Sequence, residues 1–384
     1  MRIETRMLAV LIAVLISGVL MCGCGGGNAT FGGGGNSTAA PTVATTAAQN
    51  GAVIASLAST TAGALIYYTV DGSTPTSSSQ QYQAPFLVAS NLTLNAIAIA
   101  GGSSSTVTSQ TFSPNIPSGT LVWSDEFSNT TGAAAQPDPA IWTYDTGTDC
   151  CGNNELETYC AWGSDTSPCS TASPSEYVGT SDGYLHIEAQ NPSSNVYTSA
   201  RLKTQGLFSF MYGRIEASMK LPESQGMWPA FWMLGNNIAT INWPACGELD
   251  IMEHIDGNDP PPYYGGTPPG YDWIAGSVHG GTSGNEINGG QTYHPSGFSA
   301  ADWHIYGMIW SKGQIEYYVD NPSNIYTTFT PTNSSFNGNT WPFDQGPQFI
   351  ILNLAIGGDW PGPPDNTTPF PSEMLVDYVR IYTN

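Results

Sequence analysis

Three acidic residues lie close together in the segment Gly247–Glu253, which reads Gly-Glu-Leu-Asp-Ile-Met-Glu. Glu248 and Asp250 are two residues apart, so a β-strand would place both side chains on one face. Strict alternation would put Glu253 on the opposite face. One extra residue, a β-bulge at Ile251–Met252, would return it to the side of Glu248. We therefore expect three carboxyl groups on one face of a single strand.

Paired carboxyl groups are the chemistry of glycoside hydrolysis, in which one acts as general acid and, in retaining enzymes, the other attacks the sugar. Repulsion and partial burial should raise at least one pKa, which suits a general acid. The alternative is a solvent-facing acidic patch beside a turn. Acids within an apolar strand are costly without a purpose, so the pattern favours catalysis. The apolar flanking residues are Trp243, Pro244, Leu249, Ile251, Met252 and Ile255.

The segments around this strand must form the scaffold that positions the acids. Few of them have helical periodicity, and the abundant Gly (44) and Pro (28) favour short strands joined by turns. We expect an all-β protein in which a catalytic domain over residues 118–384 forms a two-sheet jelly-roll sandwich. The clearest strands are Tyr212–Leu221, His304–Trp310, Ile315–Val319, Phe349–Ile356 and Leu375–Tyr382.

The N-terminal region indicates export. Residues 1–24 read as a signal peptide whose apolar run, Met7–Met21, is too short for a confident membrane span. Cys24 and its neighbours resemble a bacterial lipoprotein processing site, which predicts a lipid-anchored protein of the cell surface or outer membrane. Simple secretion is the alternative. Residues 25–45 are rich in Gly, Ser, Thr and Ala and predict a flexible linker.

A second zone, residues 46–115, contains a single charged residue, Asp71. Runs such as Leu65–Val70 and Leu92–Ala98 predict a small antiparallel β-sandwich. The segment Tyr67–Thr76 and its surroundings resemble the immunoglobulin-like module at the C-terminus of chitobiases. Such modules are usually spacers, and a glycan-binding role is the alternative.

Composition and charge limit the partners. Eight Lys and Arg stand against 30 Asp and Glu, giving a net charge of −22. This excludes the basic patches that a nucleic-acid partner requires and disfavours strongly anionic polysaccharides. The 11 Trp and 19 Tyr suit stacking on sugar rings, although β-sandwich cores also use many aromatic residues.

Five cysteines follow Cys24, so at least one lacks a partner within the chain. Export makes disulfides plausible, and Cys160 and Cys169 could close a short loop. We interpret Cys246 as a small buried residue. No spacing predicts a zinc site. The five are Cys150, Cys151, Cys160, Cys169 and Cys246.

Residues 121–384 resemble family 16 glycoside hydrolases, and the run Glu248–Glu253 is similar to the bulged motif of laminarinases. The resemblance implies that Glu248 is the nucleophile, Glu253 the acid/base and Asp250 the residue that tunes and orients the nucleophile. It also extends through Trp123–Phe127, Gly152–Leu156, Ser199–Leu202, Tyr212–Ala217, Met227–Leu234, Asn353–Gly358 and Val376–Arg380.

The same resemblance implies substrate-binding residues. Trp228 and Trp232 correspond to sugar platforms, although each could be a core residue. A lone histidine is otherwise usually structural, but the family has one in the cleft. The further implied residues are Arg201, Asn153 or Asn154 as hydrogen-bonding groups, and His279 as the cleft histidine.

No cofactor is expected for catalysis, but the family often carries a structural calcium ion. Glu126, the Gly183 carbonyl group and Asp377 occupy the corresponding positions, and oxygen ligands suit calcium. Three features depart from the family, one of which is Ser218, where arginine is common. Glu157 stands where glutamine is common and should add negative charge near the cleft. The loop 256–273, with Tyr263, Tyr264 and Tyr271, is expected to rim the cleft.

The sequence thus predicts a monomeric, retaining endo-β-1,3-glucanase acting on neutral laminarin-like or mixed-linkage β-glucan. Alternatives within the family are agarase and transglycosylase activities. A catalytically inactive glucan-binding protein is the alternative from another class, although all three carboxylates are present. A structural cell-surface protein is the weakest alternative.

Overall fold

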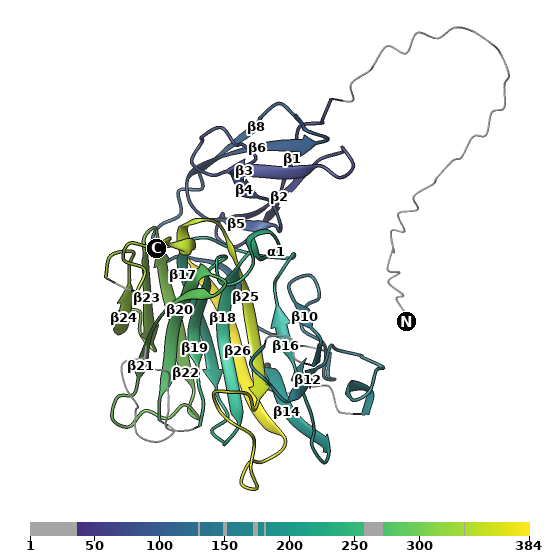
Figure 1. The fold of residues 1–384 in the computed structure, drawn as a ribbon, viewed down its shortest axis with the longest axis vertical. Coiled ribbons are helices and arrows are strands. Elements are labelled where there is room, and N and C mark those ends of the chain that lie inside the picture. The colour runs from purple at the N-terminus through teal and green to yellow at the C-terminus, as the bar shows by residue number, and fades with distance from the viewer. Residues whose placement is uncertain are drawn as a thin grey trace, which may run out of the picture. The chain divides into compact units, whose positions relative to one another are not determined.

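The computed structural model describes residues 37–129, 131–148, 152–171, 176–179, 182–256, 272–333 and 335–384 (Figure 1). The predicted signal peptide, Cys24, Cys150, Cys151 and the three loop tyrosines Tyr263, Tyr264 and Tyr271 lie outside these ranges. Within the described ranges, the helices are all too short or too polar to cross a membrane.

The N-terminal module consists of two small antiparallel sheets, as expected for an immunoglobulin-like sandwich. Their shared core includes Leu57, Tyr68, Phe86 and Leu94. One sheet has the order β1 (Thr42–Ala47), β2 (Val53–Ala58), β5 (Phe86–Val88). The other contains β4 (Gln80–Gln81), β3 (Leu65–Thr69), β6 (Leu92–Ala100), β7 (Ser103–Ser104) and β8 (Thr108–Phe112).

The first strand of this module begins earlier than the sequence suggested. Residues 25–45 were expected to form a flexible linker, but β1 starts at Thr42 and pairs along its length with β2. Three threonines and one valine give the run Thr42–Ala47 a β-propensity that its small-residue composition obscured.

The catalytic region is a sandwich of two large sheets, which confirms the jelly-roll architecture. The seven-stranded sheet carries the acidic strand near its centre. In spatial order it contains β10 (Thr143–Asp145), β16 (Arg201–Lys203), β25 (Gln348–Ile356), β18 (Met227–Gly235), β19 (Glu248–Glu253), β20 (Ile274–Thr282) and β21 (Asn285–Tyr293).

The second sheet has eleven strands and supports the first. Its main path is β11 (Gly147–Thr148), β12 (Glu157–Tyr159), β15 (Val196–Ser199), β14 (Leu185–Ser193), β26 (Ser372–Tyr382), β17 (Gly213–Lys220), β22 (His304–Ser311), β23 (Gln314–Val319) and β24 (Ile325–Phe329). Strands β13 (Glu176–Val178) and β9 (Leu121–Asp125) pair with β14 and β26. The described helices are short: α1 (Ile238–Ile241), η1 (Cys169–Thr171) and η3 (Pro342–Asp344).

The core lies between the two sheets, and side-chain alternation separates it from the cleft. On β18, Phe231 and Met233 are fully buried in the core, whereas Trp228 and Trp232 line the opposite face. This period of two is what a half-buried strand requires. The seven-stranded sheet therefore has one face for packing and one for function.

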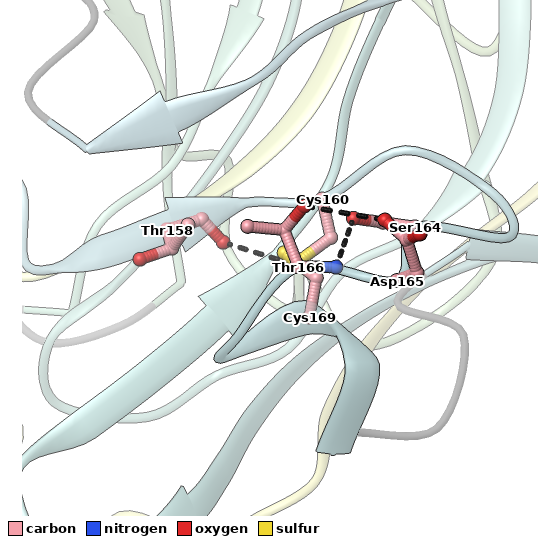
Figure 2. Close-up of a disulfide and its surroundings, with 6 residues drawn as sticks. All are labelled: Thr158, Cys160, Ser164, Asp165, Thr166 and Cys169. Atoms are coloured by element: carbon pink, nitrogen blue, oxygen red, sulfur yellow. Dashed lines mark hydrogen bonds between the residues drawn. A yellow bond between two sulfur atoms is a disulfide. The ribbon is translucent and has the colours of Figure 1, made fainter.

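The cysteines behave as the sequence predicted where they are described. Cys160 and Cys169 form a disulfide with a Cα–Cα distance of 5.5 Å, which closes a loop directly after β12 (Figure 2). Cys246 is a free, buried thiol.

Candidate active site

Strand β19 contains the predicted bulge. Strand β18 pairs with Asp250 and with Met252 but leaves Ile251 without an opposite residue. Ile251 and Met252 both pack in the core, so the chain returns Glu253 to the cleft side, where Glu248 and Asp250 also lie. The sequence prediction of three acids on one face is confirmed.

These acids lie in a cleft with a volume of about 790 Å³. Four indole rings form much of its apolar lining: Trp228, Trp232, Trp243 and Trp360. Its other polar lining residues are Asn153, Glu155, Arg201, His279, Glu286, Asn288 and Asn353. Flat apolar rings with a few placed polar groups are suited to a sugar polymer.

Glu248 is held by a hydrogen bond from the first turn after α1. Trp243 Nε1 donates to Glu248 Oε2 at 2.7 Å. Desolvation and the negative charge of Asp250 raise the pKa of Glu248 to about 8, although the charge of His279 and the Trp243 hydrogen bond act in the opposite direction. Glu248 therefore lies where ionisation is costly and where two groups favour its charged form.

Glu253 has a different neighbour. Trp228 Nε1 donates to Glu253 Oε1 at 3.0 Å, and the Glu253 side chain is largely buried. The ring of Trp228 thus lines the cleft and its N–H orients the second glutamate. Each outer acid of the bulged strand therefore accepts a hydrogen bond from its own indole donor.

Asp250 connects the acids to a histidine. Ser277 Oγ donates to Asp250 Oδ2 at 2.5 Å, and His279 Nε2 lies 3.0 Å from the same oxygen. His279 Nδ1 lies 2.8 Å from Asn288 Oδ1, an acceptor. Burial alone would lower the pKa of His279, but Asp250 and then Glu248 outweigh it and raise that pKa to about 10. The imidazolium partly compensates the three carboxylates.

The predicted sugar platforms both line the cleft, and Trp232 is fixed from two directions. Its Nε1 donates to Asn353 Oδ1 at 2.7 Å, and the Arg201 guanidinium lies 4.5 Å from its ring centroid. Arg201 Nε is also 3.0 Å from Asp145 Oδ2. These contacts place an ion-paired arginine and an aromatic ring together on the cleft wall.

Of the two candidate asparagines, only Asn153 lies at the cleft. Asn153 lines the cleft, and its amide donates to Glu155 Oε1 at 3.2 Å. The Asn154 amide nitrogen lies 2.9 Å from each carboxylate oxygen of Asp359 and does not line the cleft. A positive φ of 56° at Asn154 turns the chain, so the two adjacent side chains point in different directions.

Several cleft residues were not identified as functional from the sequence. Trp243 was interpreted only as an apolar flanking residue, although it lies five residues before Glu248 in the sequence. Asn353 lies in a strand that the sequence predicted, Phe349–Ile356, but the register needed to place it was not readable. Asn288 lies on β21, a strand that was not predicted. Trp360 follows β25 and packs edge-on against Trp228, with ring centroids 5.4 Å apart.

One of the proposed calcium ligands, Glu126, is paired with Arg380 in this structure. The Arg380 guanidinium donates to both carboxylate oxygens of Glu126, at 2.9 and 2.7 Å. A calcium ion bound by Glu126, the Gly183 carbonyl group and Asp377 would require Arg380 to move, because the ion and the guanidinium compete for the same oxygens. The residues as arranged do not fit the ion, and calcium binding stays a prediction.

Comparisons with known proteins agree with this geometry. The family model for glycosyl hydrolases family 16 matches residues 167–380. The model for the chitobiase/beta-hexosaminidase C-terminal domain matches residues 34–110. The second match covers the N-terminal module and begins before the expected boundary at residue 46.

Individual relatives cover most of the catalytic region. A beta-glucanase of Rhodothermus marinus is 35% identical over 281 residues, which are 70% of this chain and 87% of the relative. A glucan endo-1,3-beta-glucosidase A1 of Niallia circulans is 34% identical, and the match covers 70% of this chain but 38% of that longer protein.

Solved structures agree as well. The laminarinase catalytic domain of Thermotoga maritima is 36% identical with a TM-score of 0.56, covering 70% of this chain and 99% of that one. Sequence motifs, the bulged strand and the structural match all lead to the same assignment. The chain belongs to the glycosyl hydrolases of family 16.

Proposed function

We propose that this glycoside hydrolase is a retaining endo-β-1,3-glucanase that acts on laminarin-like or mixed-linkage β-glucan. The observation that carries the proposal is the bulge in β19, which presents Glu248 and Glu253 to one cleft with Asp250 between them. Relatives named as laminarinases and endo-1,3-beta-glucosidases support the substrate class.

In the first step, Glu248 attacks the anomeric carbon while Glu253 gives its proton to the departing glycosidic oxygen. The carbon–oxygen bond to the leaving sugar breaks, and a glycosyl-enzyme ester forms. The Trp243 N–H and the His279 imidazolium favour the ionised form of Glu248. Glu248 and Glu253 are close enough that the protonation of one affects the other. The first step requires that, with substrate bound, Glu253 carries the proton and Glu248 is ionised.

In the second step, Glu253 has become a carboxylate and takes a proton from water. The water oxygen attacks the same carbon, the ester bond breaks and Glu248 is released as a carboxylate. Two displacements return the β-configuration. The contacts of Asp250 with Ser277 and His279 fix its carboxylate between the two glutamates.

A neutral substrate suits the charge of the chain. The net charge of −22 repels polyanions, and Arg201 is the one basic Lys or Arg side chain among the described cleft residues. Its guanidinium is already paired with Asp145. A sulfated polymer would therefore meet little compensating charge.

The proposal is tested by incubating the protein with laminarin, barley β-glucan, agarose and xyloglucan and sizing the products over time. Early release of medium-length oligosaccharides from laminarin is expected. Cleavage of agarose alone would favour agarase activity, and products longer than the substrate would favour transglycosylation. Binding of laminarin without cleavage would identify a glucan-binding protein and refute the proposal.

We also propose that the chain is exported and anchored by a lipid on Cys24, with the N-terminal module as a spacer and the catalytic domain acting as a monomer. The signal-like segment and the processing motif around Cys24 support this. Mass spectrometry of the mature N-terminus tests the anchor. An unlipidated first residue at another position would refute it.

A further inference from the structure

A second pair of carboxyl groups, two residues apart in sequence, lies at the cleft. Glu155 lines the cleft, whereas Glu157 at the start of β12 is 1% exposed. The two side chains lie within hydrogen-bonding reach of each other. Two ionised carboxylates have no hydrogen to share, so a hydrogen bond between them requires a proton on one of them.

The contacts and burial favour Glu157 as the residue that carries the proton. Glu155 already accepts hydrogen bonds from the Tyr159 hydroxyl at 3.0 Å and from the Asn153 amide at 3.2 Å. Glu157 Oε2 accepts the backbone N–H of Ile356 at 2.7 Å. A neutral Glu157 satisfies every contact, because its carbonyl oxygen accepts that N–H and its hydroxyl donates to Glu155.

Burial first, and then the hydrogen bond and charge of Glu155, raise the pKa of Glu157 well above its usual value. This direction runs against the expectation that Glu157 adds negative charge near the cleft. As a neutral acid it presents one acceptor and one donor, which are the groups of the glutamine common at this position in the family.

Resting on the proposed function, we propose that Glu155 is a substrate-binding residue that accepts a hydroxyl hydrogen from a β-glucan glucose unit, and that neutral Glu157 is the positioning residue that holds it. The place suits a sugar next to a platform. A β-carbon on Gly358 would lie 3.6 Å from the Trp228 ring and 3.7 Å from Glu155 Cγ, so both border one small space.

The pair is also connected to the other platform. Tyr159 donates to Glu155 and accepts from the Asn353 amide at 3.3 Å, and Asn353 accepts from Trp232. The disulfide Cys160–Cys169 immediately follows β12 and ties its end to the next loop (Figure 2). A shift of Glu157 would therefore disturb Glu155 and the residues beyond it.

Other titratable groups around the pair set its pH response. Tyr159 is on the same strand, and Tyr197 of β15 is the register partner of Glu157. The ion pair of Arg201 with Asp145 lies beyond Tyr159, and its positive charge acts on that tyrosine. As pH rises, loss of the shared proton would place two negative charges together and break their hydrogen bond, so KM should rise at alkaline pH.

The test compares four variants on laminarin. Glu155→Gln and Glu157→Leu should each raise KM about tenfold with kcat within about threefold, because a hydrogen bond to a charged acceptor is lost or misplaced. Glu157→Gln should have a KM close to that of wild type, unlike Glu157→Leu, and its KM should not rise at alkaline pH. Asp302→Asn, which alters an exposed acid outside the cleft, is the matched charge control and should behave as wild type.

Three results would overturn the proposal. These are an unchanged KM in Glu155→Gln, a wild-type KM in folded Glu157→Leu, or an alkaline KM rise that persists in Glu157→Gln. If Glu157→Leu does not fold, Glu157→Gln decides through its pH profile and through infrared spectroscopy, where it should remove one protonated carboxyl stretch at neutral pH. If wild type cleaves none of the glucans, the proposed function itself has failed.

Discussion

The cleft contains two groups of carboxyl side chains that limit crowded negative charge in different ways. The trio on β19 is compensated by a cation and by indole N–H donors, since His279 contacts Asp250 and Trp243 donates to Glu248. The pair Glu155–Glu157 instead shares a proton within a hydrogen bond. The trio must exchange protons during each turnover, whereas the pair must keep its proton. A carboxyl group that takes part in catalysis must therefore be able to gain and lose a proton, whereas one that positions a neighbour must remain protonated.

The largest expected effect concerns the attacking group of the trio. Glu248→Gln should lower kcat on laminarin by about 10⁴-fold or more, because a neutral amide cannot form the glycosyl ester. Kinetics with thermal unfolding of the same sample measure this. The variant should unfold at the wild-type temperature or above, since a costly buried charge is removed. Undiminished turnover would refute the role of Glu248.

The acid/base glutamate should show an effect that depends on the leaving group. Glu253→Gln should reduce cleavage of glucan by about 10²–10⁴-fold, the usual contribution of general acid–base catalysis. Formation of the glycosyl-enzyme from an aryl glycoside with an acidic phenol should suffer much less, because that leaving group needs no proton. Equal losses in single-turnover rates on both substrates would contradict the assignment.

Trp243 offers a smaller and more selective change. Its N–H lowers the pKa of Glu248, so Trp243→Phe should raise that pKa further above about 8. More of the nucleophile is then protonated at any given pH, and the acidic limb of the kcat/KM profile should move to higher pH. We expect a loss of about tenfold below neutral pH. Trp360→Phe removes an indole N–H at another point of the same cleft and should leave the position of this limb unchanged.

The smallest expected effect comes from Glu157→Gln in the Glu155–Glu157 pair, and it concerns the free energy of unfolding. The raised pKa of Glu157 stabilises the folded state fully below its unfolded pKa of about 4.5, and this contribution is lost as pH rises towards the folded pKa. Glu157→Gln has no such titration. Its free energy of unfolding relative to wild type should therefore increase with pH, by on the order of 1 kcal/mol or more. Denaturant unfolding at pH 4, 6 and 8 checks this, and parallel curves would contradict a protonated Glu157.

Much of the catalytic strand could be predicted from the sequence alone. The spacing of Glu248, Asp250 and Glu253 requires a bulge if all three are to share a face, and the structure contains that bulge. The strand periods of the surrounding sandwich were also readable, because apolar alternation and turn residues mark strand boundaries. Local patterns were sufficient wherever one strand or one turn decided the outcome.

Features that depend on contacts between distant segments were not predictable. The charge of Glu157 depends on a backbone N–H donor 199 residues away and on burial under neighbouring strands. The difference between Asn153 and Asn154 depends on one left-handed residue. The start of β1 at Thr42 was hidden by a composition typical of linkers. Burial and contacts between distant segments decide the case of Glu157, whereas the other two cases were missed because a single positive φ and a linker-like composition gave no readable local signal.

The separation of roles within the trio is tested most directly by trapping the glycosyl-enzyme. The protein is incubated with a 2-deoxy-2-fluoro laminaribioside that carries a good leaving group, digested with a protease and analysed by mass spectrometry. The account predicts one labelled peptide with the sugar esterified to Glu248, and no label in Glu248→Gln. A sugar attached to Glu253, or turnover of the reagent with no covalent adduct and with inverted product, would contradict it.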